Sequence, residues 1–230
     1  MDYLLQGLIT ATGLLLRLDA EVWGIVATSL AVSLLAVLIA GAIAVPLGVL
    51  TAMHDFRGRP ALLQALNTLM AIPTVVVGLL LYGLLSRRGA LGDLGLLYTP
   101  AAIVIGEALL ILPILWNMTI TAISGTDPRL AMTCRVLGAS AWQQTWLFVR
   151  EARYGIVAAV VMGFGRAIGE VGIAMMLGGN IAGFTRTMTT AIALETSKGE
   201  FELALALGIV LLLVAFVVNL ALQRLQRGRQ

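Results

Sequence analysis

Three ionisable residues stand inside long apolar segments of this sequence: Glu107, Arg166 and Glu170. Arg166 and Glu170 are four positions apart, a spacing that puts a cation and a carboxylate on one face of a helix, where they can pair. Charges in an apolar environment are costly, and they normally pair or face protein or water. The pair is therefore a neutralised structural contact between helices, or the border of a polar path or its gate, and the two interpretations are compatible. For Glu107 we favour polar packing.

A polar stretch at residues 127–156 separates two apolar segments and is too long for a simple connector. Asp127 and Pro128 suit the N-cap and the first position of a helix, and Gly138 ends or bends that helix. The predicted apolar face of this short helix is Leu130, Cys134 and Leu137. A second short helix is predicted after it, with Trp142 and Trp146 at i and i+4. Such a helix–glycine–helix unit is either a surface that docks into a partner's cleft or an amphipathic loop packed on lipid headgroups.

Residues that could support catalysis are scarce. The chain has one cysteine, Cys134, and one histidine, His54, so an internal disulfide, a zinc site and a histidine-based triad are poorly supported. No glycine-rich phosphate-binding motif occurs. We therefore expect neither an enzyme nor a bound metal.

Composition places the chain in a membrane. Hydrophobic residues make up 60% and charged residues 12% of the sequence, whereas soluble domains carry about 25% charged residues. The apolar runs are too long for the strands of a barrel, and helices satisfy their own backbone hydrogen bonds in lipid. The predicted fold class is all-α, a polytopic membrane helix bundle that forms a single domain over residues 1–230.

Five confident spans are predicted, at residues 22–53, 60–86, 98–123, 155–178 and 203–222. Residues 1–18 are shorter than the roughly 20 apolar residues that a span needs, so we expect an interfacial helix there, with a sixth span as the alternative. The loop at 179–202 ends in charges that we expect to be solvated, namely Glu195, Lys198, Glu200 and Glu202.

Arginine and lysine positions predict the orientation, because cytoplasmic loops carry the excess of these residues. Placing residues 127–156 and the basic tail inside gives nine cations inside and five outside. The inner set is Arg57, Arg59, Arg129, Arg135, Arg150, Arg153, Arg224, Arg227 and Arg229, and the outer set is Arg17, Arg87, Arg88, Arg186 and Lys198. The N-terminus is then outside.

The segment RVLGASAWQQTW at residues 135–146 resembles the EAA loop of binding-protein-dependent type I ABC importer permeases, through its Gly-Ala-Ser-x-Trp-Gln core. The resemblance implies a cytoplasmic coupling loop at about 124–154 that docks into an ATPase subunit. The residues it implicates are Arg129, Leu130, Cys134, Arg135, Leu137, Gly138, Ala139, Ser140, Trp142 and Gln143. This sequence has Met-Thr-Cys at 132–134 in place of the family's Glu-Ala-Ala, and Arg-Glu at 150–151 in place of its Leu-Pro. Because the glutamate is missing, we do not expect a salt bridge from that position to the ATPase. Docking by shape and by Arg129 or Arg135 is expected instead.

A second signature covers residues 163–208 and contains RAIGEVG at 166–172 and GGNI at 178–181. It resembles the tungstate-type oxyanion permeases and, more loosely, those for molybdate and sulfate. Threonines around Arg186 could offer transient contacts to an anion, with a partner-docking or solvated loop as the alternative that we favour. The candidate path or gate residues are Glu107, Arg166, Glu170, Asn180, Thr185, Arg186 and Thr187.

Together these resemblances imply a multi-pass permease of the cell (inner) membrane, within an ATP-driven importer of tungstate or molybdate that works by alternating access. The implied partners are a second copy of the chain, two ATPase subunits, an extracytoplasmic oxyanion-binding protein and membrane lipid, with no nucleic acid. ATP and magnesium would bind the ATPase, and this chain would bind no cofactor. The alternatives are an ABC permease for sulfate or phosphate, an ion-driven secondary transporter and a membrane enzyme.

Overall fold

The computed structural model describes residues 9, 12–13, 16 and 19–227 of the 230-residue chain. All regular secondary structure in this part of the chain is helical, which confirms the predicted fold class. From residue 19 onward the elements are α2 (Ala20–Met53), α3 (Arg59–Ala71), α4 (Thr74–Leu85), the 3-10 turn η1 (Gly92–Leu94), α5 (Pro100–Ser124), α6 (Arg129–Val136), α7 (Ala141–Ile168), α8 (Gly172–Gly178), α9 (Met188–Lys198) and α10 (Phe201–Arg227). The predicted helix at residues 1–18 lies mostly outside the described residues.

The described helices account for the five predicted spans. Three are long and apolar enough to cross a membrane, namely α2, α5 and the Phe201–Leu220 part of α10. Two bent pairs supply the others if each pair is one span, with a bend of 95° between α3 and α4 and of 60° between α7 and α8. The first break follows from Pro73, because a residue before proline is disfavoured in the helical region, and Ile72 is extended, with ψ 131.

Helix α5 forms the centre of the bundle and packs against α2, α3, α4, α7 and α8. One core cluster joins buried side chains of α2, α5, α7 and α8, including Val37, Ile111, Leu115, Ala167 and Ala174. Many of its members are alanines. Lipid is as apolar as this core, so association depends on close packing of small residues rather than on a hydrophobic driving force.

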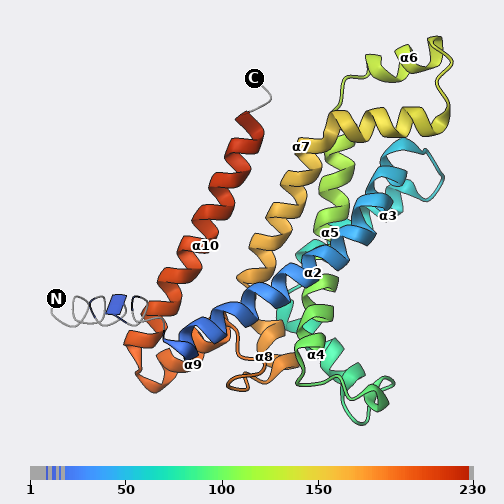
Figure 1. Cartoon of the computed structure of the whole chain (residues 1–230). Helices are drawn as coiled ribbons and strands as arrows, with labels where there is room; N and C mark the ends of the chain where they lie inside the picture. The colour runs from blue at the N-terminus through green and yellow to red at the C-terminus, as the bar shows by residue number, and fades with distance from the viewer. Residues whose placement is uncertain (1–8, 10–11, 14–15, 17–18, 228–230) are drawn as a thin grey trace.

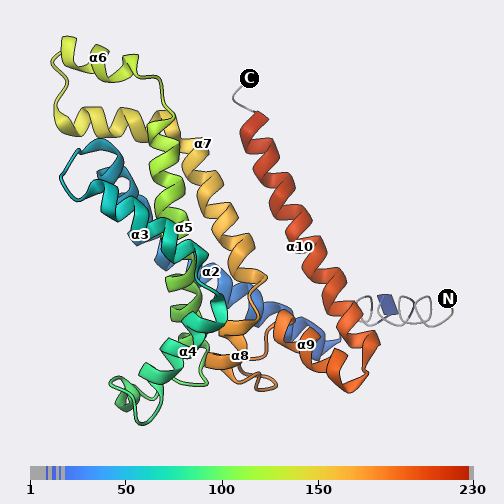
Figure 2. The same ribbon diagram turned by 180° about the vertical axis from the view of Figure 1, so that it is seen from behind.

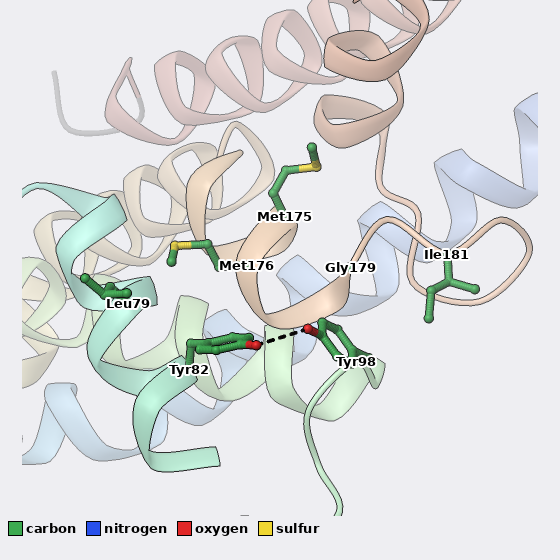
Figure 3. Close-up of a pocket in the computed structure, with 7 residues that line it drawn as sticks. All are labelled: Leu79, Tyr82, Tyr98, Met175, Met176, Gly179 and Ile181. Atoms are coloured by element: carbon green, nitrogen blue, oxygen red, sulfur yellow. Dashed lines mark hydrogen bonds between the residues drawn. The ribbon is translucent and has the colours of Figure 1, made fainter. Parts of the chain in front are cut away.

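Figures 1 and 2 show α6 at one end of the molecule, together with the α2–α3 loop and the last turns of α10. Helices α4, α8 and α9 occupy the opposite end (Figure 1). The arrangement agrees with the predicted topology, which puts the polar stretch, the loop at 54–58 and the tail on one side. The second short helix predicted after Gly138 is not separate, because α7 runs from Ala141 to Ile168.

Gly48 provides a test of the α2–α5 contact, because a Cβ atom there would lie 2.6 Å from the Thr119 Cβ and 3.1 Å from the Trp116 carbonyl oxygen. Gly48→Val is expected to destabilise the bundle by about 1–3 kcal/mol through overpacking. Unfolding in mixed micelles would measure this loss. Gly24→Val is the matched control, since it lies on the same helix and has nothing within 4 Å. Equal losses at both sites would mean that helix propensity, and not the contact, is responsible.

Candidate coupling surface and intramembrane charge cluster

The polar stretch folds into α6, a turn and the start of α7. The Asp127 carboxylate accepts a hydrogen bond from the Arg129 backbone N–H at 2.8 Å, so the aspartate caps α6 as predicted. Side-chain burial differs from the prediction. Cys134 is buried and Leu130 half-buried, but Leu137 is 77% exposed, because α6 ends at Val136 before the third apolar position is reached.

Gly138 terminates α6 in the left-handed region, with φ +66. The Ala139 N–H bonds back to the Cys134 carbonyl at 2.9 Å, which is the six-to-one bond of a Schellman C-cap with glycine at the C′ position. A side chain at residue 138 would be strained there. The glycine of the Gly-Ala-Ser core is thus required by backbone geometry.

Ser140 and Gln143 start the next helix with a reciprocal capping box. The Ser140 hydroxyl accepts from the Gln143 N–H at 3.3 Å, and the Gln143 side-chain oxygen accepts from the Ser140 N–H at 2.8 Å. Two of the free N–H groups at the start of α7 are satisfied in this way. The Gly-Ala-Ser-x-Trp-Gln sequence therefore encodes a helix stop followed at once by a helix start.

Large apolar side chains project from this unit into the surroundings. Leu137 and Trp142 are 77% and 75% exposed, and Met132, Val136 and Trp146 are also exposed. We call these five residues the coupling patch. Helix α6 lies at the end of the molecule beyond the bundle (Figure 1). Several large apolar side chains exposed on one helix–turn–helix unit are typical of a protein-interaction site. Arg129 is exposed beside it, while the Arg135 side chain lies outside the described set.

Arg166 and Glu170 form the ion pair that their spacing indicates, with 2.7 Å between Arg166 Nη1 and Glu170 Oε2. They do not share one helix face, however, because α7 ends at Ile168 and Glu170 lies in the break before α8. The other oxygen, Glu170 Oε1, accepts from the Ile173 N–H at 3.3 Å in the first turn of α8. The Glu170 side chain is 3% exposed and the Arg166 side chain 39%.

Glu170 also connects to α9 through its backbone. The Thr189 hydroxyl donates to the Glu170 carbonyl at 2.7 Å. A Cβ on the neighbouring Gly172 would lie 3.3 Å from Thr74 Oγ1 at the start of α4, so the two breaks in the bent spans lie side by side. Glu170 therefore links α7, α8 and α9 where both spans bend.

Glu107 lies in the middle of α5, 2% exposed, beside the buried Ser33 of α2. Its Oε2 has no hydrogen-bond partner among the described residues. The neighbouring Gly106 packs against Ile173 and Leu177 of α8. This burial between helices supports polar packing for Glu107.

The loop from 179 to 187 uses its polar groups within the protomer. The buried Thr185 hydroxyl donates to the Gly178 carbonyl at 2.6 Å and accepts from the Ile181 N–H at 3.0 Å. Thr187 begins α9 with a capping box, and the Asn180 side chain donates to the Thr190 carbonyl at 3.4 Å. These polar groups bond within the loop and to α9, so they hold the loop in shape.

Arg186 joins α2 to α9. Its Nη1 lies 3.4 Å from Glu21 Oε1 and 3.8 Å from Glu195 Oε1. Glu195 is buried, and Lys198 pairs with it at 3.0 Å. The expectation that Glu195 is a solvated rim charge is therefore wrong. Glu195 and Lys198 have the i, i+3 spacing of an ordinary exposed pair, so nothing in the sequence distinguishes a buried Glu195 from a solvated one. The loop before α9 brings Arg186 close to Glu195 only in the folded chain.

The fold and these contacts define a polytopic membrane subunit with an exposed helix pair, α6 and the start of α7, at one end. The family model of the binding-protein-dependent transport system inner membrane component matches residues 44–230, and the chain belongs to this family. It is the permease subunit of an ABC importer and not an enzyme, since the ATPase of such importers is a separate subunit. The family implies an ATPase and a substrate-binding protein as partners.

Three curated relatives illustrate the match. The tungstate uptake system permease protein TupB of Peptoclostridium acidaminophilum is 39% identical over 98% of this chain and 99% of its own. The TupB protein of Campylobacter jejuni is 36% identical over 99% and 95%. The molybdenum transport system permease protein ModB of Escherichia coli K12 is 29% identical over 90% and 96%.

Solved structures share the fold. An amino acid ABC transporter crystallised with histidines superposes with a TM-score of 0.67 at 16% identity, over 93% of this chain and 96% of that chain. A bacterial alginate ABC transporter in complex with an alginate-bound periplasmic protein gives a TM-score of 0.69 at 20% identity, over 90% and 79%. These likenesses confirm the permease architecture.

Proposed function

We propose that this permease imports a tetrahedral oxyanion, with tungstate as its substrate and molybdate as the next best. The observation that carries this proposal is the near full-length similarity to two tungstate uptake permeases, at 39% and 36% identity. The matched region is 98% of this chain for the first relative. In this chain, Glu170 of the RAIGEVG segment joins α7, α8 and α9. Sulfate or phosphate is the alternative substrate.

The coupling patch supports alternating access driven from the cytosol. Two copies of the chain would form one pathway, each copy docking its coupling patch on one ATPase subunit. ATP and magnesium would bind between the ATPases, whose closure moves α6 and the first turns of α7. Helix α7 continues without interruption from the docked end to Arg166, so it can transmit that motion to the break at Glu170 as a rigid body.

Weak binding in the permease suits this role. Arg166 and Arg186 are both paired with carboxylates, so neither presents an unneutralised charge that would trap an anion. Conduction requires that a solute can leave as well as enter. Selectivity would then reside mainly in the extracytoplasmic binding protein that delivers the oxyanion.

Competition for uptake tests the substrate. The permease, its ATPase and its binding protein would be reconstituted in vesicles, and uptake of labelled molybdate measured against unlabelled tungstate, sulfate or phosphate. Tungstate is expected to suppress uptake at the lowest concentration, while sulfate and phosphate compete only at large excess. If sulfate or phosphate displaces the label as well as tungstate does, the substrate proposal is wrong while the permease class stands.

A further inference from the structure

Helix α3 has two exposed flanks of different polarity. Gln64, Asn67 and Thr68 recur at i, i+3 and i+4 and are exposed on one flank, as the period of about 3.6 residues per turn requires. Ala65 and Leu69 are exposed on the other flank. Helix α3 is the half of its bent span that begins at the α2–α3 loop, on the side of the coupling patch (Figure 1).

Helix α5 adds a second polar row beside the first. Asn117, Thr121 and Ser124 follow one another at i, i+4 and i+7, with Thr121 and Ser124 exposed and Asn117 half-buried. The Asn117 side-chain N–H donates to Asn67 Oδ1 at 3.0 Å and joins the two rows. We call this continuous surface the amide–hydroxyl face: Gln64, Asn67, Thr68, Asn117, Thr121 and Ser124.

Exposed amides and hydroxyls within a spanning region are unfavourable against hydrocarbon, because no acceptor or donor there replaces water. Such groups face water or protein in membrane bundles. The apolar flank of α3 with Leu69 is suited to lipid, whereas the amide–hydroxyl face is not. We propose that the amide–hydroxyl face lines the aqueous path through which the oxyanion reaches the cytosol. This inference rests on the proposed function for the identity of the solute.

The chemistry of this face fits transient contact with an oxyanion. Within the described chain, the Gln64 amide and the Asn67 Nδ2 group have no hydrogen-bond partner, so their N–H groups are free to donate to an anionic oxygen. The Thr68 and Thr121 hydroxyls already donate to the Gln64 and Asn117 carbonyls at 2.9 and 3.0 Å. The amides therefore make the contact. Neutral donors bind an anion more weakly than cations do, which allows release.

Cysteine accessibility in the full transporter tests the assignment. Single cysteines would be placed by Gln64→Cys, Asn67→Cys and Thr121→Cys on the amide–hydroxyl face, and by Ala65→Cys and Leu69→Cys on the apolar flank. The parent chain, whose one cysteine, Cys134, is 4% exposed, supplies the background rate. The reagent is a membrane-impermeant anionic thiosulfonate, which reacts with the thiolate form of cysteine. Apolar surroundings disfavour the thiolate, so we expect modification on the amide–hydroxyl face to be about tenfold faster than on the apolar flank.

Tungstate is then added with the binding protein and ATP, and is expected to slow modification of the three face positions. Equal rates of modification on both flanks would overturn the proposal. Fast modification of the amide–hydroxyl face that no oxyanion slows would also overturn it, because a helix face that is simply open to the cytosol would behave in this way. Protection by sulfate but not by tungstate would support the path and reject the proposed substrate. In uptake assays, Gln64→Leu and Asn67→Leu should lower anion transported per ATP hydrolysed by about tenfold, the loss of one charge-assisted contact, while Leu69→Ala does not change it.

Discussion

Gly138→Val is expected to uncouple transport from ATP hydrolysis while the chain still inserts in the membrane. Gly138 has φ +66 and nothing within 4 Å of a Cβ atom, so the substitution acts through the backbone and not through a clash. Left-handed geometry costs an L-residue about 1–2 kcal/mol. Relief of that strain would rotate α6 away from the capping box of α7, and the coupling patch would lose its shape.

Stimulation of the ATPase by loaded binding protein, measured in reconstituted vesicles, is expected to fall about 5- to 30-fold, the factor that 1–2 kcal/mol represents. Gly138→Asn should retain much of the stimulation, because asparagine tolerates the left-handed region. Gly95→Val is the matched control, since Gly95 has φ +60 and open space around it but lies near η1, away from α6. Normal stimulation in Gly138→Val would remove the docking role from this turn.

Arg166→Ala is expected to destabilise the protein more than Glu170→Ala. Removing the guanidinium leaves the Glu170 carboxylate, which is 3% exposed, without its cation, and an uncompensated buried charge costs about 3–5 kcal/mol. Removing the carboxylate deletes both the bond to Arg166 Nη1 at 2.7 Å and the bond from the Ile173 N–H at 3.3 Å. The charge that it leaves, on Arg166, is 39% exposed, so solvent screening reduces the cost of that isolated charge.

A double-mutant cycle, measured by unfolding in mixed micelles, separates the free energy of the Arg166–Glu170 contact from that of the bond between Glu170 and the Ile173 N–H. The two single changes should together cost about 0.5–3 kcal/mol more than the double change costs, because each leaves a partner uncompensated. Glu170→Gln should fall between wild type and alanine, since its oxygen can still accept from Ile173. Strict additivity would show that the Arg166–Glu170 contact contributes no coupling energy.

Local features of the sequence were sufficient to predict that a helix begins after Asp127 and ends or bends at Gly138. Both residues act on backbone groups within a few residues of themselves, as helix-cap chemistry does in any fold. The capping box of Ser140 and Gln143 is equally local, although it was not predicted. The membrane spans were also predictable, because hydropathy and length are properties of one segment at a time. Pro73 separates α3 from α4 for a local reason as well, because the residue before a proline is disfavoured in the helical region.

Features that depend on a distant partner were not predictable in this way. The Arg166–Glu170 spacing indicated a pair, but the position of Glu170 in a helix break depends on Thr189 and on the packing of α8 against α4. Burial of Glu195 depends on Arg186, which the loop before α9 brings to it. A charge at the end of a helix looks the same in sequence whether it is solvated or paired.

The amide–hydroxyl face shows the same division. In sequence, Gln64, Asn67 and Thr68 are three polar residues within a segment read as one continuous span. Their meaning arises from the 95° bend that separates α3 from α4 and from the 3.0 Å bond that brings Asn117 to Asn67 across 50 residues. Composition, helix caps and helical spacing thus specify an all-α membrane bundle and the helix end at Gly138, because these are short-range effects. The polar surfaces and charge links inside the membrane form only when separate helices pack together.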